Sequence, residues 1–167
     1  MCWATAAAAR TPAGDEPEVA IDRPLLQLAE RGPDAGWCSM SARVLLVDDN
    51  PFDRELAAWA LRKIPCPPGP IELLCAPSWD EARVLLAPGD IDLLLLDYGL
   101  PGCTGLDILR TELTTRHPRV IVVTGHDDVG TAVATMREGA FDYVPKGLDW
   151  GDALARSVAQ ALVQPAS

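Results

Sequence analysis

The sequence has few lysines and no long apolar run. Only two of its 14 basic residues are lysines, Lys63 and Lys146, and the others are arginines. No apolar run approaches the roughly 20 residues that a membrane-spanning helix needs. The N-terminal stretch MCWATAAAARTPAG lacks the basic start and Leu-rich centre of a secretory signal. The sequence therefore predicts neither a membrane span nor a secretory signal. Because lysine is so rare in this Arg-rich chain, each of the two lysines is considered as a candidate functional residue.

The cysteine pattern and the net charge also disfavour some common classes of protein. The cysteines form no C-x-x-C pair and are odd in number, which favours a reduced, cytoplasmic protein. They are Cys2, Cys38, Cys66, Cys75 and Cys103. The formal net charge is −10, which disfavours direct binding to nucleic acid or to an anionic membrane.

Residues 1–40 differ in composition from the rest of the chain. They are rich in Ala, Pro, Gly and acidic residues, which predicts a disordered extension. Because Met40 directly precedes SARVLLVDDN, a mis-assigned translation start is a second explanation. We expect one ordered domain over residues 42–164. Since Lys146 is followed by only 21 residues, which one helix uses up, we expect no output domain.

From Arg43 onward, five apolar runs alternate with five helical patterns. Asn50 and Pro51 are typical of a helix cap and a first turn. The expected strands are 43–47, 71–76, 91–96, 119–125 and 141–144, and the expected helices are 51–64, 78–86, 105–114, 128–138 and 149–163. This alternation predicts a doubly wound α/β fold, with a parallel five-stranded sheet in the flavodoxin-like order 2-1-3-4-5.

The unusual polar residues fall where the predicted strands end. Asp48 and Asp49 end the first strand, Asp97 the third and Thr124 the fourth, and Lys146 follows the fifth. In the order 2-1-3-4-5 these ends are neighbours, so the side chains should converge. Converging carboxylates repel each other, and Mg²⁺ suits such an open oxygen site. A metal, a lysine and a hydroxyl around an aspartate favour phosphoryl transfer, in which an aspartate can form an acyl phosphate.

At this point the chain resembles a known family, the receiver domain of two-component response regulators. The resemblance covers residues 42–164 and rests on VLLVDDNPFDR, LLLLDYGLPGCTGLDIL, VIVVTG and GAFDYVPK, which are specific in combination. It implies a stand-alone signalling module, not a turnover enzyme, with Asp97 as the phosphoacceptor. Its partners would be a histidine kinase or phosphotransfer protein upstream, and a second copy or an unknown protein downstream.

The resemblance also implies a ligand set for Mg²⁺. Asp49 and Asp97 would bind the metal directly, with the main-chain carbonyl of Gly99 as the third protein ligand. Asp48 would act mainly through metal-bound water.

Further residues receive roles from the same resemblance. Thr124 and Lys146 would hold the phosphoryl oxygens, and Tyr143 would couple its rotamer to Thr124. The positions flanking the phosphoryl group would be Gly99, Gly125 and His126. The output surface would be the face formed by the helix at 128–138, the strand at 141–144 and the helix at 149–163. One departure is Lys146-Gly147, where the family usually has Lys-Pro, often with a cis bond.

Other interpretations remain open. Each site residue alone has an ordinary explanation as a cap, a strand end or a surface charge, and it is their convergence that favours a phosphoacceptor site. A receiver-like scaffold that works without phosphorylation is one alternative. A phosphatase of the haloacid-dehalogenase type is another, although that family places its nucleophile in D-x-D after the first strand. Away from the site, Trp59, Trp79 and Trp150 are expected to be packing residues.

Overall fold

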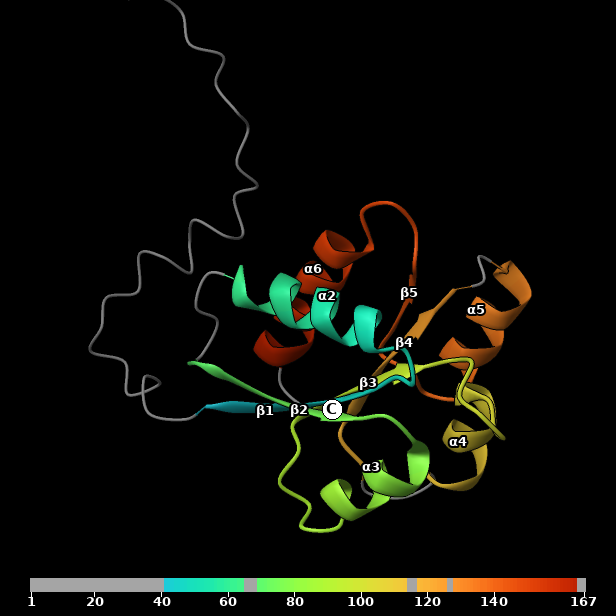
Figure 1. Ribbon diagram of the computed structural model, residues 1–167. Coiled ribbons are helices and arrows are strands. Elements are labelled where there is room, and N and C mark those ends of the chain that lie inside the picture. The colour runs from blue at the N-terminus through green and yellow to red at the C-terminus, as the bar shows by residue number, and fades with distance from the viewer. Residues whose placement is uncertain (1–40, 65–68, 114–116, 126–127, 165–167) are drawn as a thin grey trace, which may run out of the picture. The chain divides into compact units, whose positions relative to one another are not determined.

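A five-stranded parallel sheet lies between two layers of helices in the computed structural model of the chain (Figure 1). The structure describes residues 41–64, 69–113, 117–125 and 128–164, so the prediction for residues 1–40 lies outside the described residues. The strands are β1 (Ala42–Val47), β2 (Ile71–Ala76), β3 (Leu93–Asp97), β4 (Arg119–Thr124) and β5 (Asp142–Pro145). The helices are α2 (Pro51–Arg62), α3 (Trp79–Leu86), α4 (Gly105–Thr111), α5 (Val129–Arg137) and α6 (Trp150–Val163).

The strand order is β2-β1-β3-β4-β5, and every pairing is parallel. The predicted fold class and topology are therefore confirmed. Most boundaries move by one or two residues, and α4 ends at Thr111, earlier than the expected Thr114.

The central strand β3 explains how the two layers are held to the sheet. Alternate residues of a strand point to opposite faces. Leu93 and Leu95 accordingly pack with residues of α2 and α6, whereas Leu94 and Leu96 pack with residues of α3 and α4. Figure 1 shows these two pairs of helices on opposite faces of the sheet. All four are fully buried, and burying one leucine side chain contributes about 1.5–3 kcal/mol. Parallel pairing with β1 on one side and β4 on the other places the last residue of the strand, Asp97, opposite Val123.

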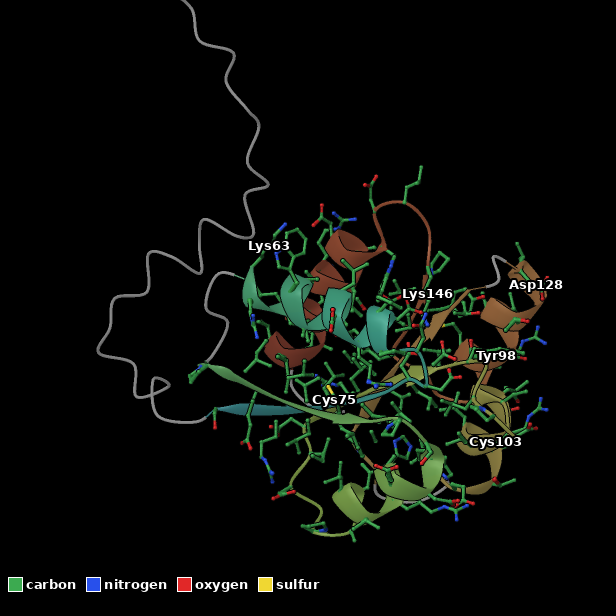
Figure 2. The ribbon with its side chains drawn as sticks, in the orientation of Figure 1. Lys63, Cys75, Tyr98, Cys103, Asp128 and Lys146 are labelled. Atoms are coloured by element: carbon green, nitrogen blue, oxygen red, sulfur yellow. The ribbon has the colours of Figure 1, made fainter. Side chains whose placement is uncertain are left out.

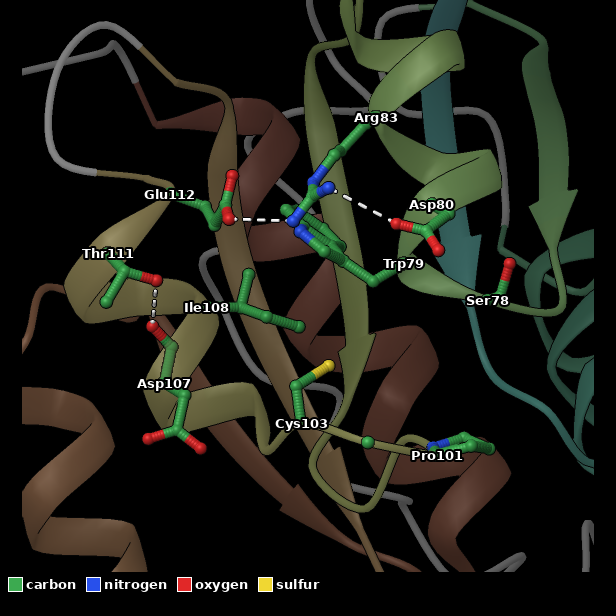
Figure 3. Close-up of a pocket in the computed structure, with 11 residues that line it drawn as sticks. Ser78, Trp79, Asp80, Arg83, Pro101, Cys103, Asp107, Ile108, Thr111 and Glu112 are labelled. Carbon is green, nitrogen blue, oxygen red and sulfur yellow. Dashed lines mark hydrogen bonds and ion pairs between the residues drawn. The ribbon is translucent and has the colours of Figure 1, made fainter.

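The helices begin at side-chain caps that the sequence largely predicts. Asn50 Oδ1 accepts a hydrogen bond from the backbone N–H of Phe52 at the start of α2. Ser78 Oγ accepts one from the backbone N–H of Glu81 at the start of α3. A complete capping box lies at α4, where the side chains of Thr104 and Asp107 each accept a bond from the other's backbone N–H. Figure 3 shows Asp107 on this helix.

The three tryptophans of the ordered domain do not all pack inside it. Trp79 and Trp150 are buried, as expected. Trp59 is 52% exposed, and the ammonium of Lys63 lies 3.2 Å from the centroid of its ring. The packing prediction was therefore wrong for Trp59. The buried face of α2 is formed by small residues and a leucine, including Ala57 and Leu61, and leaves the indole on the outside.

Among the residues that the structure describes, no helix combines the length and the apolar character needed to cross a bilayer.

Candidate functional site

Three of the five buried polar residues among those that the structure describes lie at the carboxyl edge of the sheet. Asp48 directly follows β1, Asp97 ends β3 and Thr124 ends β4, and all three side chains are buried. Adjacent pairing places these ends side by side, since Val47 is opposite Leu96 in neighbouring strands. The sheet topology thus brings together these three residues, which were predicted to converge because each lies at the end of a strand.

Lys146 joins the carboxylates of this edge. Its Nζ lies 2.7 Å from Asp48 Oδ2, 2.8 Å from Asp53 Oδ2 and 2.7 Å from Asp97 Oδ1. A lysine ammonium has three N–H donors, and here each of them meets a different carboxylate. Figure 2 shows the Lys146 side chain at the carboxyl end of the sheet. The lysine holds together residues from α2, β3 and the end of β1.

Asp53 is the member of this group that the sequence analysis missed. It lies in the first turn of α2, where an acidic residue has an ordinary explanation, because it stabilises the positive end of the helix dipole. The available signal was the short distance along the chain from Asp48. A helix that starts at Pro51, immediately after the strand end, keeps its first turn close to the edge of the sheet.

Burial and hydrogen bonding act in opposite directions on the charges of the site. Burial raises the pKa of Asp48, and hydrogen bonds from Lys146 and from the backbone of Asn50 offset part of that rise. Burial alone would lower the pKa of Lys146, but its hydrogen bonds to Asp48, Asp53 and Asp97 outweigh burial and raise it. Lys146 is therefore a permanent cation at neutral pH.

The loop after Asp97 fixes the second oxygen of that carboxylate. The backbone N–H of Gly99 donates to Asp97 Oδ2 at 2.8 Å, while Oδ1 accepts from Lys146. The loop returns to α4 through a hydrogen bond from Gly105 N–H to the carbonyl of Tyr98 at 2.8 Å. A Cβ at Gly105 would lie 3.2 Å from Tyr98 Cα, so a glycine there permits the close approach.

The carboxylate oxygens of this site are the type of ligand that a hard divalent cation prefers. The lysine ammonium, however, lies between the carboxylates. Asp49 is exposed beside the buried Asp48. No group of three or more His, Cys, Asp or Glu side chains within the described ranges is arranged to hold a metal ion. The expected metal set of Asp48, Asp49, Asp97 and the Gly99 carbonyl therefore stays a prediction.

The structure describes Tyr143 and Gly125 among the remaining predicted residues. Tyr143 is half-buried and packs against the core on the side of α3 and α4. Gly125 is exposed at the end of β4. His126 lies outside the described residues. The Lys146–Gly147 peptide bond is trans. The roles predicted for these residues stay predictions.

The comparisons with known proteins agree with this fold. The family model described as the response regulator receiver domain matches residues 44–157. The chain belongs to this family of two-component signalling domains. Receiver domains are signalling domains and not turnover enzymes on external substrates, and they generally bind Mg²⁺ at an acidic phosphorylation site.

Similar proteins include longer regulators as well as isolated receiver domains. The chain is 36% identical over 122 residues to the response regulator protein PilR of Pseudomonas aeruginosa, covering 72% of this chain and 26% of PilR. It is 38% identical over 116 residues to the DNA-binding transcriptional regulator NtrC of Escherichia coli K12, covering 67% of this chain and 23% of NtrC. The chain thus spans about a quarter of the length of these relatives.

A solved structure shows a similar fold. The receiver domain protein from Clostridium thermocellum matches with a TM-score of 0.60 and 31% identity, covering 72% of this chain and 94% of that one.

Proposed function

We propose that the chain accepts a phosphoryl group on Asp97, from a histidine kinase or a phosphotransfer protein, in a reaction that uses Mg²⁺. The observation that supports this most strongly is the buried Asp97 carboxylate at the end of β3, with Lys146 Nζ 2.7 Å from Oδ1. An oxygen of Asp97 attacks the phosphorus atom of a phosphohistidine. The new P–O bond forms as the P–N bond breaks, and the bonding pair leaves with the imidazole.

The side chains around Asp97 have complementary roles in this proposal. Lys146 is the fixed cation that offsets the charge developing on the phosphoryl oxygens. Thr124, buried at the end of the neighbouring strand, supplies a hydroxyl donor to one of those oxygens. A metal held by Asp49, Asp97 and the Gly99 carbonyl, with Asp48 behind a metal-bound water, would offset further negative charge.

Phosphorylation can be tested with acetyl phosphate, a small donor that needs no kinase. Intact-mass analysis of the wild type with Mg²⁺ should show one labile phosphate, and chelation of the metal should abolish it. Asp97→Asn should show none. The matched control is Asp92→Asn, which removes the same charge from an exposed position and should leave the yield unchanged. Persistent labelling of the Asp97 variant would contradict the assignment.

The proposed output surface is the face formed by α5, β5 and α6. Three apolar side chains at helical spacing on α5 are exposed, namely Val129, Val133 and Met136. A phosphoryl group on Asp97 would draw the Thr124 hydroxyl inward and give Tyr143 room to turn, which changes this face. Such a two-state change is read by a partner that prefers one state. The proposed partner is a second copy or another protein, and the net charge of −10 argues against nucleic acid binding by this domain. The proposed compartment is the cytoplasm.

Amide NMR can locate this change. Addition of Mg²⁺ and beryllofluoride, a phosphoryl mimic, should shift resonances in α5 and β5, and Thr124→Ala should reduce those shifts. Shifts confined to the loops that hold Asp49 and Asp97 would place the output surface elsewhere.

A further inference from the structure

The ammonium of Lys146 has no donor to spare. Its three N–H groups meet Asp48, Asp53 and Asp97 at 2.7, 2.8 and 2.7 Å. A phosphoryl oxygen on Asp97 can receive a hydrogen bond from Lys146 only if one of these contacts is given up. Whether Lys146 can donate a hydrogen bond to the phosphoryl group therefore depends on which of the three carboxylates releases it during the reaction.

The three partners of Lys146 are not equivalent. Asp48 and Asp97 belong to the strand ends where the metal and the phosphoryl group are proposed to bind, so the reaction itself gives each of them a new partner. Asp53 comes from the first turn of α2, and its side chain is more exposed than theirs, at 24% against 2% and 8%. Neither the proposed metal nor the phosphoryl group replaces the bond between Asp53 and Lys146.

We propose that Asp53 is a positioning residue that restrains Lys146 and weakens the affinity of the site for a phosphoryl group. This inference rests on the proposed function. Asp53 acts in two ways, because it retains one donor of the ammonium on the side of α2 and places a further negative charge beside a phosphoryl group that is itself negative. Both effects favour the unphosphorylated state.

The scarcity of lysine makes this restraint directly measurable. Lys63 and Lys146 are the two lysines of the sequence, so protein labelled with ¹³C at lysine Cε gives two side-chain signals. Lys63 is an internal reference, since it lies over the Trp59 ring and away from the carboxyl edge. The Lys146 signal reports the contacts of the ammonium itself, which activity measurements do not.

The experiment compares Asp53→Asn with the wild type in two steps. Without ligand, the Lys146 signal should move in the variant while the Lys63 signal stays in place. In a titration with beryllofluoride at fixed Mg²⁺, the midpoint of the Lys146 shift should fall about tenfold, as expected for removing one charge several ångströms from an anion. Asp53→Ala should act in the same direction, and Asp53→Glu, which restores the charge, should return the midpoint toward the wild-type value.

The matched control is Glu55→Gln, which removes a negative charge from an exposed position on the same helix and should leave both signals and the midpoint unchanged. A wild-type midpoint in both Asp53→Asn and Asp53→Ala overturns the restraint, while the wild-type response to beryllofluoride still supports the proposed function. If the Lys146 signal of the wild type does not respond to Mg²⁺ and beryllofluoride, the proposed function fails together with this inference.

Discussion

Both ends of the sheet carry a basic residue between carboxylates, but the two clusters have different surroundings. At the carboxyl edge, the side chains of Lys146, Asp48, Asp53 and Asp97 are 12%, 2%, 24% and 8% exposed. At the amino edge, Arg43 pairs with Glu72 and Asp90, and these side chains are 29%, 49% and 48% exposed. A charge pattern alone would not separate the two clusters. Burial distinguishes the two clusters. The buried cluster at the carboxyl edge is the one whose arrangement of charges is unfavourable.

The physical consequence is a large difference in electrostatic free energy. Exposed ion pairs contribute about 0–1 kcal/mol, because solvent and salt screen them. A buried group of three carboxylates and one ammonium carries a desolvation penalty that its hydrogen bonds offset incompletely, as the raised pKa of Asp48 indicates. Such an arrangement agrees with the proposal that a second cation and a phosphoryl group bind here.

The largest expected effect comes from removing the buried cation. Lys146→Met leaves Asp48 and Asp97 without their counter-charge and should lower the free energy of unfolding by about 3 kcal/mol, measured by urea denaturation in the absence of divalent ions. Added Mg²⁺ should restore part of the loss, because a metal can take over the role of the ammonium. A variant as stable as the wild type would mean that the buried cluster behaves like the exposed one.

A smaller effect of opposite sign is expected at Asp48. Its pKa is raised in the folded state, so folding favours the protonated acid, and the contribution of Asp48 to stability falls as the pH rises through the folded pKa. At pH 7 Asp48→Asn should therefore be more stable than the wild type, by less than the loss expected for Lys146→Met. The difference should disappear below the ordinary pKa of an aspartate, as denaturation at low pH would show. A less stable Asp48→Asn at pH 7 would contradict this sign.

The smallest effect is expected at the amino edge. Arg43→Met removes the cation of the exposed cluster and should change the free energy of unfolding by less than about 1 kcal/mol. Because salt screens exposed charges, the difference should shrink further in high salt. A loss as large as that of Lys146→Met would remove the distinction between the two edges.

The sequence was sufficient to predict the residues that strand ends position. Asp48, Asp97, Thr124 and Lys146 could be located because buried parallel strands end at one edge, whichever rotamers their side chains adopt. Asp53 could not, because its contact with Lys146 depends on the direction in which a side chain leaves the first turn of a helix.

The exposure of Trp59 likewise could not be predicted from the sequence. Periodicity identifies the apolar face of α2, but it does not say that the small residues, including Ala57 and Ala60, form the buried part of the helix surface. An apolar residue elsewhere on the same helix then remains exposed, as Trp59 does.

The identity of the phosphorylated residue is the most direct test of the central proposal, because Asp48 is also buried and also bonded to Lys146. Borohydride reduces an aspartyl phosphate to homoserine, which peptide mass spectrometry can locate in the sequence. After treatment with acetyl phosphate and Mg²⁺, homoserine should be found at position 97. Homoserine at position 48, 49 or 53, with position 97 unchanged, would contradict Asp97 as the phosphoacceptor.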